Sequence, residues 1–342
     1  MYNTKTNYLS WKSGTGAVFM IALLLVPMFN RGGSLNMLMN YVILITMNIA
    51  LVQSWNIMGG LAGLFSMGHA AFFGIGAYCL AITLRAVDSG ALQVAHSSGI
   101  VLGVLLGLVV SLILAFIISA ISTRLSGFFF TMSTIALLSA MVAAVGAWPR
   151  VTNGTLGIPI FRPPIDRAVF FYISIGLAVA YTLCFAFLRK ARMGSMLVSI
   201  RDNIHLARSL GVRDLRYKVL SCVVSSLMAS LVGAVYVYFV RSVAPSIFFA
   251  SIASMVVMVG IIGGIGTVWG PVLGSSLILV DELVRTMLGS VYAPLVNVAF
   301  GIIMIVMVIL KPEGLVSLRI KHSLALILKA LKPVAKSPEE GV

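Results

Sequence analysis

The residues whose type and spacing favour a specific role lie in one basic run, residues 189–218. This run, RKARMGSMLVSIRDNIHLARSLGVRDLRYK, holds eight of the chain's 24 basic residues and only two acids. Apolar side chains recur in it every three or four positions, which predicts a helix with one apolar stripe flanked by Arg201 and Arg208. The stripe comprises Leu197, Ile200, Ile204, Ala207 and Leu210. Such a helix is suited either to dock on a partner protein or to lie on acidic lipid headgroups.

Residues suited to covalent chemistry or metal binding are sparse. The four histidines are scattered, and the three cysteines form no CxxC pair, so neither a zinc site nor a disulfide framework is indicated. No GxxxxGK[ST] motif occurs, so we do not expect this chain to bind ATP through a P-loop. We therefore expect no catalytic residue, no metal and no cofactor in this chain.

The composition predicts a membrane protein. The chain of 342 residues is 60% hydrophobic and 10% charged, and its mean hydropathy is +1.08. A net charge of +15 would suggest nucleic acid for a soluble protein. Here the basic residues lie in short loops beside apolar spans, so membrane orientation explains them better. We expect membrane lipid as a partner, and no nucleic acid.

Spans of about 20 apolar residues divide the chain into an all-α polytopic membrane protein of about ten transmembrane helices. With the N-terminus in the cytoplasm, 17 of the 24 basic residues fall on the cytoplasmic side, which favours both termini inside. An alternative is eight full spans plus re-entrant segments. The ten expected spans are 14–30, 37–58, 61–84, 99–121, 127–148, 168–188, 219–240, 247–268, 271–288 and 291–310.

This division gives three regions. Residues 1–13 form a cytoplasmic N-terminus, followed by a retained first span rather than a cleaved signal peptide. Residues 14–310 form the transmembrane domain, with the basic run 189–218 as its cytoplasmic loop. Residues 311–342 form a cytoplasmic tail, which we expect to lie on the membrane as an amphipathic helix.

Two glycine-broken segments, residues 59–76 and 263–274, lie in opposite halves of the chain. Paired segments of this kind are typical of transporters with an internal repeat and a pathway between the halves. Close helix packing without any ligand explains the glycines equally well. The pathway candidates are Asn56, Gly59, Gly60, Ser66, His69, Thr134, Gly263, Gly264 and Gly266.

A third short segment, residues 152–158, carries Gly and Asn between Pro149 and Pro163 in the longest outward loop. It is either a turn or a receiving surface for a substrate or carrier protein. Asp281 and Glu282 are the only acids inside an expected span, and Asp281 is spaced to pair with Arg285. A self-contained secondary carrier or channel is therefore the alternative function, with weak support from buried acids.

Five stretches, in order, resemble permease subunits of ATP-binding-cassette (ABC) importers for branched-chain amino acids, of the LivM type. This class also includes urea and short-chain amide permeases. The resemblance covers roughly residues 35–320. It rests on GGLAGLFSMGHAAFFGIGAY (59–78), FFFTMSTIA (128–136), TNGTLGI (152–158), MGSMLVSIRDNIHLARSLGV (193–212) and GGIGTVWGPVLGS (263–275) followed by KPEGL (311–315).

The resemblance implies an ATP-driven importer in the cell inner membrane that works by alternating access. Its expected partners are a second, LivH-like permease subunit, two ABC ATPase subunits that hold ATP and Mg²⁺, and a periplasmic solute-binding protein. The chain departs from the family at Ser195, where a basic residue is frequent, and at Ile204, where Glu is frequent. The implied ATPase-coupling residues, joined with the apolar stripe, are Gly194, Leu197, Ile200, Arg201, Asp202, Asn203, Ile204, Ala207, Arg208, Leu210 and Gly211.

Overall fold

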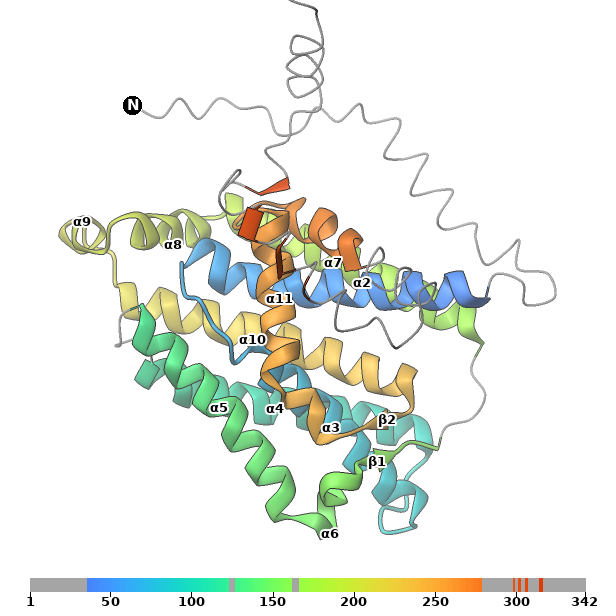
Figure 1. Ribbon diagram of the computed structural model, residues 1–342. Helices are drawn as coiled ribbons and strands as arrows, with labels where there is room; N and C mark the ends of the chain where they lie inside the picture. The colour runs from blue at the N-terminus through green and yellow to red at the C-terminus, as the bar shows by residue number, and fades with distance from the viewer. Residues whose placement is uncertain are drawn as a thin grey trace, which may run out of the picture.

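The computed structural model describes residues 36–122, 127–161, 166–278, 298, 301–302, 305–306 and 314–315. In these residues the protein is an all-α polytopic membrane protein whose helices form one bundle (Figure 1). The N-terminal region 1–13, the expected span 14–30 and the pair Asp281–Arg285 lie outside the described residues. The expected spans 271–288 and 291–310 and the tail 311–342 lie largely outside them.

Six helices are long and apolar enough to cross a membrane, judged by length and composition. Each follows an apolar run of the sequence without an internal proline. They confirm the six expected spans from 37–58 to 219–240, with shifted ends. Their bounds are α2, Asn36–Asn56, continued by the π-helix η3, Ile57–Leu61; α3, His69–Asp88; α4, His96–Ser122; α5, Phe128–Ala147; α7, Arg167–Lys190; and α10, Asp214–Val240.

Shorter elements join these helices at the two ends of the bundle. Helices α8, Arg192–Asp202, and α9, Ile204–Ser209, project at one end (Figure 1). At the other end, strands β1, Ile158–Pro159, and β2, Ser242–Val243, pair antiparallel, with Ile158 opposite Val243. The remaining elements are α6, Pro149–Thr152; η4, Gly154–Leu156; η5, Pro245–Phe248; and α11, Ala250–Gly263.

Helix α3 packs against both α10 and α4, which also contact each other. In its most apolar window 72% of α3 is buried, whereas only 22% of α4 is buried. Gly76 faces the backbone of Ser230, and Gly233 faces the backbone of Phe73, so α3 and α10 approach without intervening side chains. Helix α4 instead exposes large apolar side chains such as Leu105 and Phe116, which suit contact with lipid.

The expected span 247–268 is only partly a helix. Helix α11 has 14 residues, or about 21 Å at about 1.5 Å per residue, which is shorter than the roughly 30 Å of hydrocarbon. Arg241 ends α10 in a left-handed conformation, and the following segment turns back so that Phe248 stacks on Tyr78 of α3 at 5.5 Å between ring centroids. Irregular backbone is tolerated at membrane depth where protein covers it. Residues 241–266 nevertheless run from the end with β1 and β2, where Ile160 N donates to the carbonyl of Arg241, to the end with α8, where Gly266 lies against Gly60.

Candidate functional site: a glycine junction beside α8 and α9

The two glycine-broken segments lie against each other. The backbone N–H of Gly266 donates to Oδ1 of Asn56 at 2.8 Å, across 210 residues of sequence. Nδ2 of Asn56 donates in turn to the carbonyl of Thr267 at 2.9 Å. A methyl group on Gly60 would lie 2.7 Å from the nitrogen of Gly266, so both positions need glycine for this approach. We call residues 57–63 together with 263–267 the glycine junction.

Trp55 explains a third glycine of the junction. Its indole is fully buried and donates from Nε1 to the carbonyl of Ser66 at 3.0 Å. A Cβ on Gly59 or on Gly260 of α11 would lie 2.6 Å from this ring. Gly59 therefore makes room for Trp55, which is the packing explanation of the glycines rather than a ligand contact.

Arg201 of α8 enters the junction. Its Nη1 donates to the carbonyl of Gly60 at 2.7 Å, while its Nε and Nη2 both lie 3.0 Å from Oδ1 of Asp202. A Cβ on Gly63, which has φ 68°, would lie 2.6 Å from Cγ of Arg201. Arg201 remains 37% exposed at its side chain while its guanidinium also reaches the bundle, so its place on a docking face stays a prediction.

The C-terminal signature completes the junction. Gly264 ends α11 with φ 122°, and a Cβ on Gly314 would lie 2.5 Å from Cα of Gly264. Oγ1 of Thr267 donates to the carbonyl of Gly264 at 2.8 Å and accepts from Gly270 N at 3.0 Å. Gly263 faces the carbonyl of Gly270, where a helix begins that continues to 278, the last described residue of that segment.

Three polar pathway candidates are hydrogen-bonded within the chain. Nε2 of His69 lies 2.7 Å from Oγ of Ser54. Oγ of Ser66 accepts from Gly68 N at 3.2 Å, and Oγ1 of Thr134 accepts from Met67 N at 3.1 Å. All three candidates are buried. Their bonds organise the turn from η3 into α3, and a role in a solute pathway stays a prediction.

The basic run forms two helices, so the expectation of one continuous helix is wrong. Asn203 has an extended backbone, with φ −156°, and ends α8. Its Oδ1 accepts from His205 N at 3.1 Å and Leu206 N at 3.0 Å, which caps the start of α9. Gly211, in the left-handed region at φ 79°, follows the end of α9. Gly194 lets α8 approach the last turn of α7.

Most of the apolar stripe is not available to a partner. Leu197, Ile200 and Ala207 are at most 3% exposed, because they pack against the chain itself, and Ile204 is half-buried. Leu206 is 59% exposed and Leu210 is 74% exposed. The expectation that the whole stripe faces a partner is therefore wrong. We call Leu206 and Leu210 the α9 surface.

Arg208 also has an internal partner. Its Nη2 and Nε donate to the two carboxylate oxygens of Asp214 at 2.8 and 3.1 Å. These hydrogen bonds raise the pKa of the Arg208 guanidinium above its usual value, so it stays charged. The paired side chains tie the end of α9 to the start of α10, and α9 is thereby held at a fixed place on the bundle.

Sequence reasoning missed the contacts made by Trp55, Ser54 and Ser225. Oγ of Ser225 on α10 donates to the carbonyl of Ser54 at 2.8 Å, which joins α10 to α2. The sequence signal was available, because buried serines recur on α10 at helical spacing. They are Ser221, Ser225, Ser226 and Ser230.

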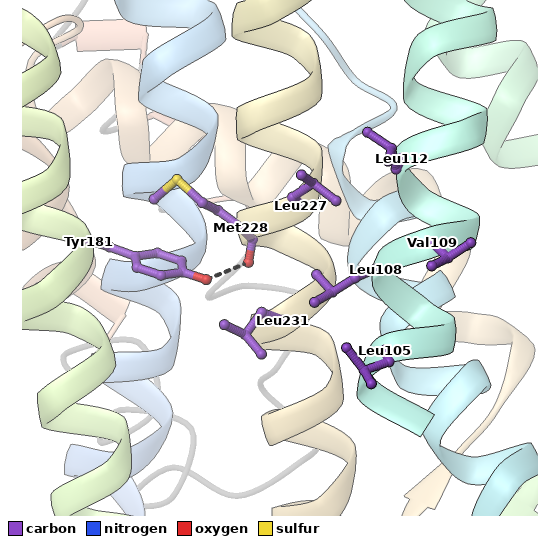
Figure 2. A pocket seen from close by; sticks show the side chains of 8 residues that line it. All are labelled: Leu105, Leu108, Val109, Leu112, Tyr181, Leu227, Met228 and Leu231. Atoms are coloured by element: carbon purple, nitrogen blue, oxygen red, sulfur yellow. Dashed lines mark hydrogen bonds between the residues drawn. The ribbon is translucent and has the colours of Figure 1, made fainter. Parts of the chain in front are cut away.

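A groove of about 430 Å³ lies between α4, α7 and α10, and Figure 2 shows the side chains that line it. Its only polar side chain is Tyr181, whose hydroxyl donates to the carbonyl of Met228 at 2.9 Å. Such a lining suits alkyl chains and not a zwitterion. A second hollow, beside Ser66 and Thr134, has about 20 Å³, room for about one water molecule. Neither offers a solute site.

Residues 152–158 form an ordered turn at the opposite end from α8. Asn153 is left-handed with φ 61°, and its Nδ2 donates to the carbonyl of Gly157 at 2.7 Å. Oγ1 of Thr152 donates to the carbonyl of Val145 at 2.6 Å. The turn leads directly into the β1–β2 pair, so its glycines and asparagine have a structural explanation. A role in receiving a substrate or a carrier protein stays a prediction.

Comparison with known proteins identifies the chain's relatives. A family model described as "Branched-chain amino acid transport system / permease component" matches residues 34–309. Two relatives are each 26% identical to this chain over 328 residues. They are the high-affinity branched-chain amino acid transport system permease proteins LivM of Escherichia coli K12 and of Salmonella typhimurium LT2. Each match covers 87% of this chain and 74% of the relative. No solved structure matches the chain.

Proposed function

This chain belongs to the family of permease components of branched-chain amino acid transport systems, and we propose that it is the LivM-type membrane subunit of an ATP-driven importer. Its substrates would be branched-chain amino acids or a related small polar solute, as the names of its relatives suggest. A LivH-like permease, two ATPase subunits and a periplasmic solute-binding protein would complete the complex in the inner membrane. ATP and Mg²⁺ would be bound by the ATPases.

The observation that carries the proposal is the α9 surface. Leu206 and Leu210 are exposed large apolar side chains on a basic loop that lies between α7 and α10 rather than within a membrane span. Neighbouring apolar side chains exposed outside lipid indicate a binding surface. By the positive-inside rule, the basic run supports a cytoplasmic location for this surface, where an ATPase would dock.

The buried side of the same loop supports a mechanical role. Leu197 packs into a cluster with Phe185 of α7 and Cys222 of α10, so α8 is attached to two spans at once. A partner that moves α9 would therefore move α7 and α10. Nucleotide and the loaded binding protein would each favour one state of the importer by binding it more tightly, and the bundle would alternate between inward-open and outward-open states.

A co-purification experiment tests the docking assignment. Leu210→Glu would bring an unpaired charge into the interface, and an unpaired buried charge costs about 3–5 kcal/mol. We expect the ATPase subunits to be lost from the purified complex, while Leu210→Met, which keeps an apolar side chain at the same position, retains them. Full retention of the ATPases by Leu210→Glu, at the level of the unchanged protein, would contradict docking through α9 and favour a lipid-bound loop.

A further inference from the structure

We propose that Arg201 is a positioning residue that transmits movement of α8 to the glycine junction, and that it does not contact the ATPase. The inference rests on the proposed function, because it requires that α8 be moved by a nucleotide-dependent partner. It assigns one residue, and one hydrogen bond, to the step between the docking loop and the membrane-spanning helices.

The first support is the space that two glycines leave for the Arg201 side chain. A Cβ on Gly63 would lie 2.6 Å from its Cγ, and a Cβ on Gly266 would lie 3.4 Å from its Nη1. Gly60 supplies the carbonyl that accepts from Nη1 at 2.7 Å. The glycines come from both halves of the chain, so the guanidinium sits where the two halves meet.

The second support is electrostatic. Gly60 lies in the last turn of the helix formed by α2 and η3, where backbone carbonyls lack helical partners and the helix dipole is negative. A guanidinium is favoured there by its charge and by its N–H groups. The other edge of the same guanidinium faces Oδ1 of Asp202 through Nε and Nη2. Lysine could not keep both contacts with one planar group.

The third support is the continuity of contacts on either side of Arg201. On one side, its own helix is fixed by the buried Leu197 and Ile200. On the other side, Gly60 continues the helix of Asn56, and Asn56 holds Gly266 and Thr267 through two hydrogen bonds. Leu197 packs with residues of η3 in one apolar cluster, and the Arg201 guanidinium adds the hydrogen bond through which a displacement of α8 reaches Gly60 and, through Asn56, the end of α11.

Hydrogen exchange in the assembled complex tests the proposal. In the unchanged complex, adding ATP should alter exchange in residues 192–209 and also in residues 57–68. In Arg201→Ala, the effect of ATP on exchange in residues 192–209 should persist. The effect of ATP on exchange in residues 57–68 should fall about tenfold or more, which is the loss expected for one hydrogen bond to a charged group. The ATPases should still co-purify. Arg201→Lys should give an intermediate response.

A matched pair of glycine variants separates transmission from general destabilisation. Gly63→Ala places a methyl group against Cγ of Arg201, whereas Gly90→Ala carries the same left-handed strain, at φ 76°, with nothing within 4 Å. Gly63→Ala should reproduce the Arg201→Ala pattern, and Gly90→Ala should respond to ATP like the unchanged complex. Because both changes act on one contact, Gly63→Ala combined with Arg201→Ala should be no worse than either alone.

Three results would overturn the proposal. The first is an ATP response of residues 57–68 that survives in Arg201→Ala, and the second is loss of the ATPases from that variant, which would make Arg201 a docking residue. The third is an unchanged complex in which ATP alters 192–209 but not 57–68. Failure of the proposed function would look different, because the unchanged complex would then bind no ATPase and show no ATP response in 192–209.

Discussion

Asn56→Ala would remove the two hydrogen bonds by which this side chain of α2 holds the second glycine segment. Oδ1 accepts from Gly266 N at 2.8 Å in a buried position, and Nδ2 donates to Thr267 O at 2.9 Å in a partly buried one. A buried donor without a partner costs about 1–3 kcal/mol, and the partly buried carbonyl adds about 1 kcal/mol. The expected loss of unfolding free energy is therefore about 2–4 kcal/mol. Side-chain hydrogen bonds within bilayers average about 0.6 kcal/mol, so the smallest loss of unfolding free energy that we expect from removing two of them is about 1 kcal/mol.

Asn48→Ala is the matched control, because Asn48 lies on the same helix and donates only to the carbonyl of Leu44, four residues earlier, at 3.0 Å. Its loss should cost about 0.5–1.5 kcal/mol. The assay is reversible denaturation of the purified protein in detergent micelles, with protease cleavage within 263–270 as a local readout. Equal destabilisation by both variants, with no new cleavage in Asn56→Ala, would refute the claim that Asn56 holds the junction together.

Further predictions follow from burial and exposure. Gly59→Leu should destabilise the protein by about 1–3 kcal/mol through overpacking against Trp55, whereas Gly176→Leu should not, because a Cβ there would meet nothing within 4 Å. Thermal denaturation distinguishes the two variants, and equal melting temperatures would contradict the close packing of Gly59 on Trp55. Ile200→Glu should lower the yield of folded protein, because Ile200 is 3% exposed; a normal yield with loss of ATPase binding would restore Ile200 as a docking residue. With the native cysteines replaced, cysteines introduced at the exposed Ser195 and Thr155 should react with an impermeant thiol reagent from opposite sides of the membrane; labelling of both from one side would reject the topology.

The sequence predicted the spans well where one physical cue dominates. Runs of about 20 apolar residues without proline specified the helices from α2 to α10, since hydrocarbon thickness and backbone hydrogen bonding leave little choice. At 247–268 it predicted a longer helix than the 14-residue α11, which follows an irregular segment that contains the left-handed Arg241 and Pro245. Hydropathy measures transfer to lipid and does not distinguish a continuous helix from a shorter helix joined to irregular backbone that protein covers.

The candidate site was predicted in part. The glycines of 59–63 and 263–266 were expected to matter, but sequence alone could not show that the two segments touch, because Asn56 and Gly266 are 210 residues apart. The helical stripe in 197–210 was recognised, yet periodicity does not tell which partner covers an apolar face. Leu197 and Ile200 cover the chain's own core, whereas Leu206 and Leu210 remain exposed. Arg201 was expected to flank the stripe, and it is exposed, but its contact with Gly60 could not be foreseen because Gly60, Gly63 and Gly266 come from distant segments.

The measurement that tests the account most directly is solute uptake into liposomes of defined composition. The chain alone should neither hydrolyse ATP nor take up radiolabelled leucine under a proton or sodium gradient. Reconstituted with its LivH-like partner, the two ATPases and the solute-binding protein, it should import leucine only when ATP is supplied on the side of α8 and α9. Gradient-driven uptake by the isolated chain, or ATP-independent uptake by the complex, would contradict the account.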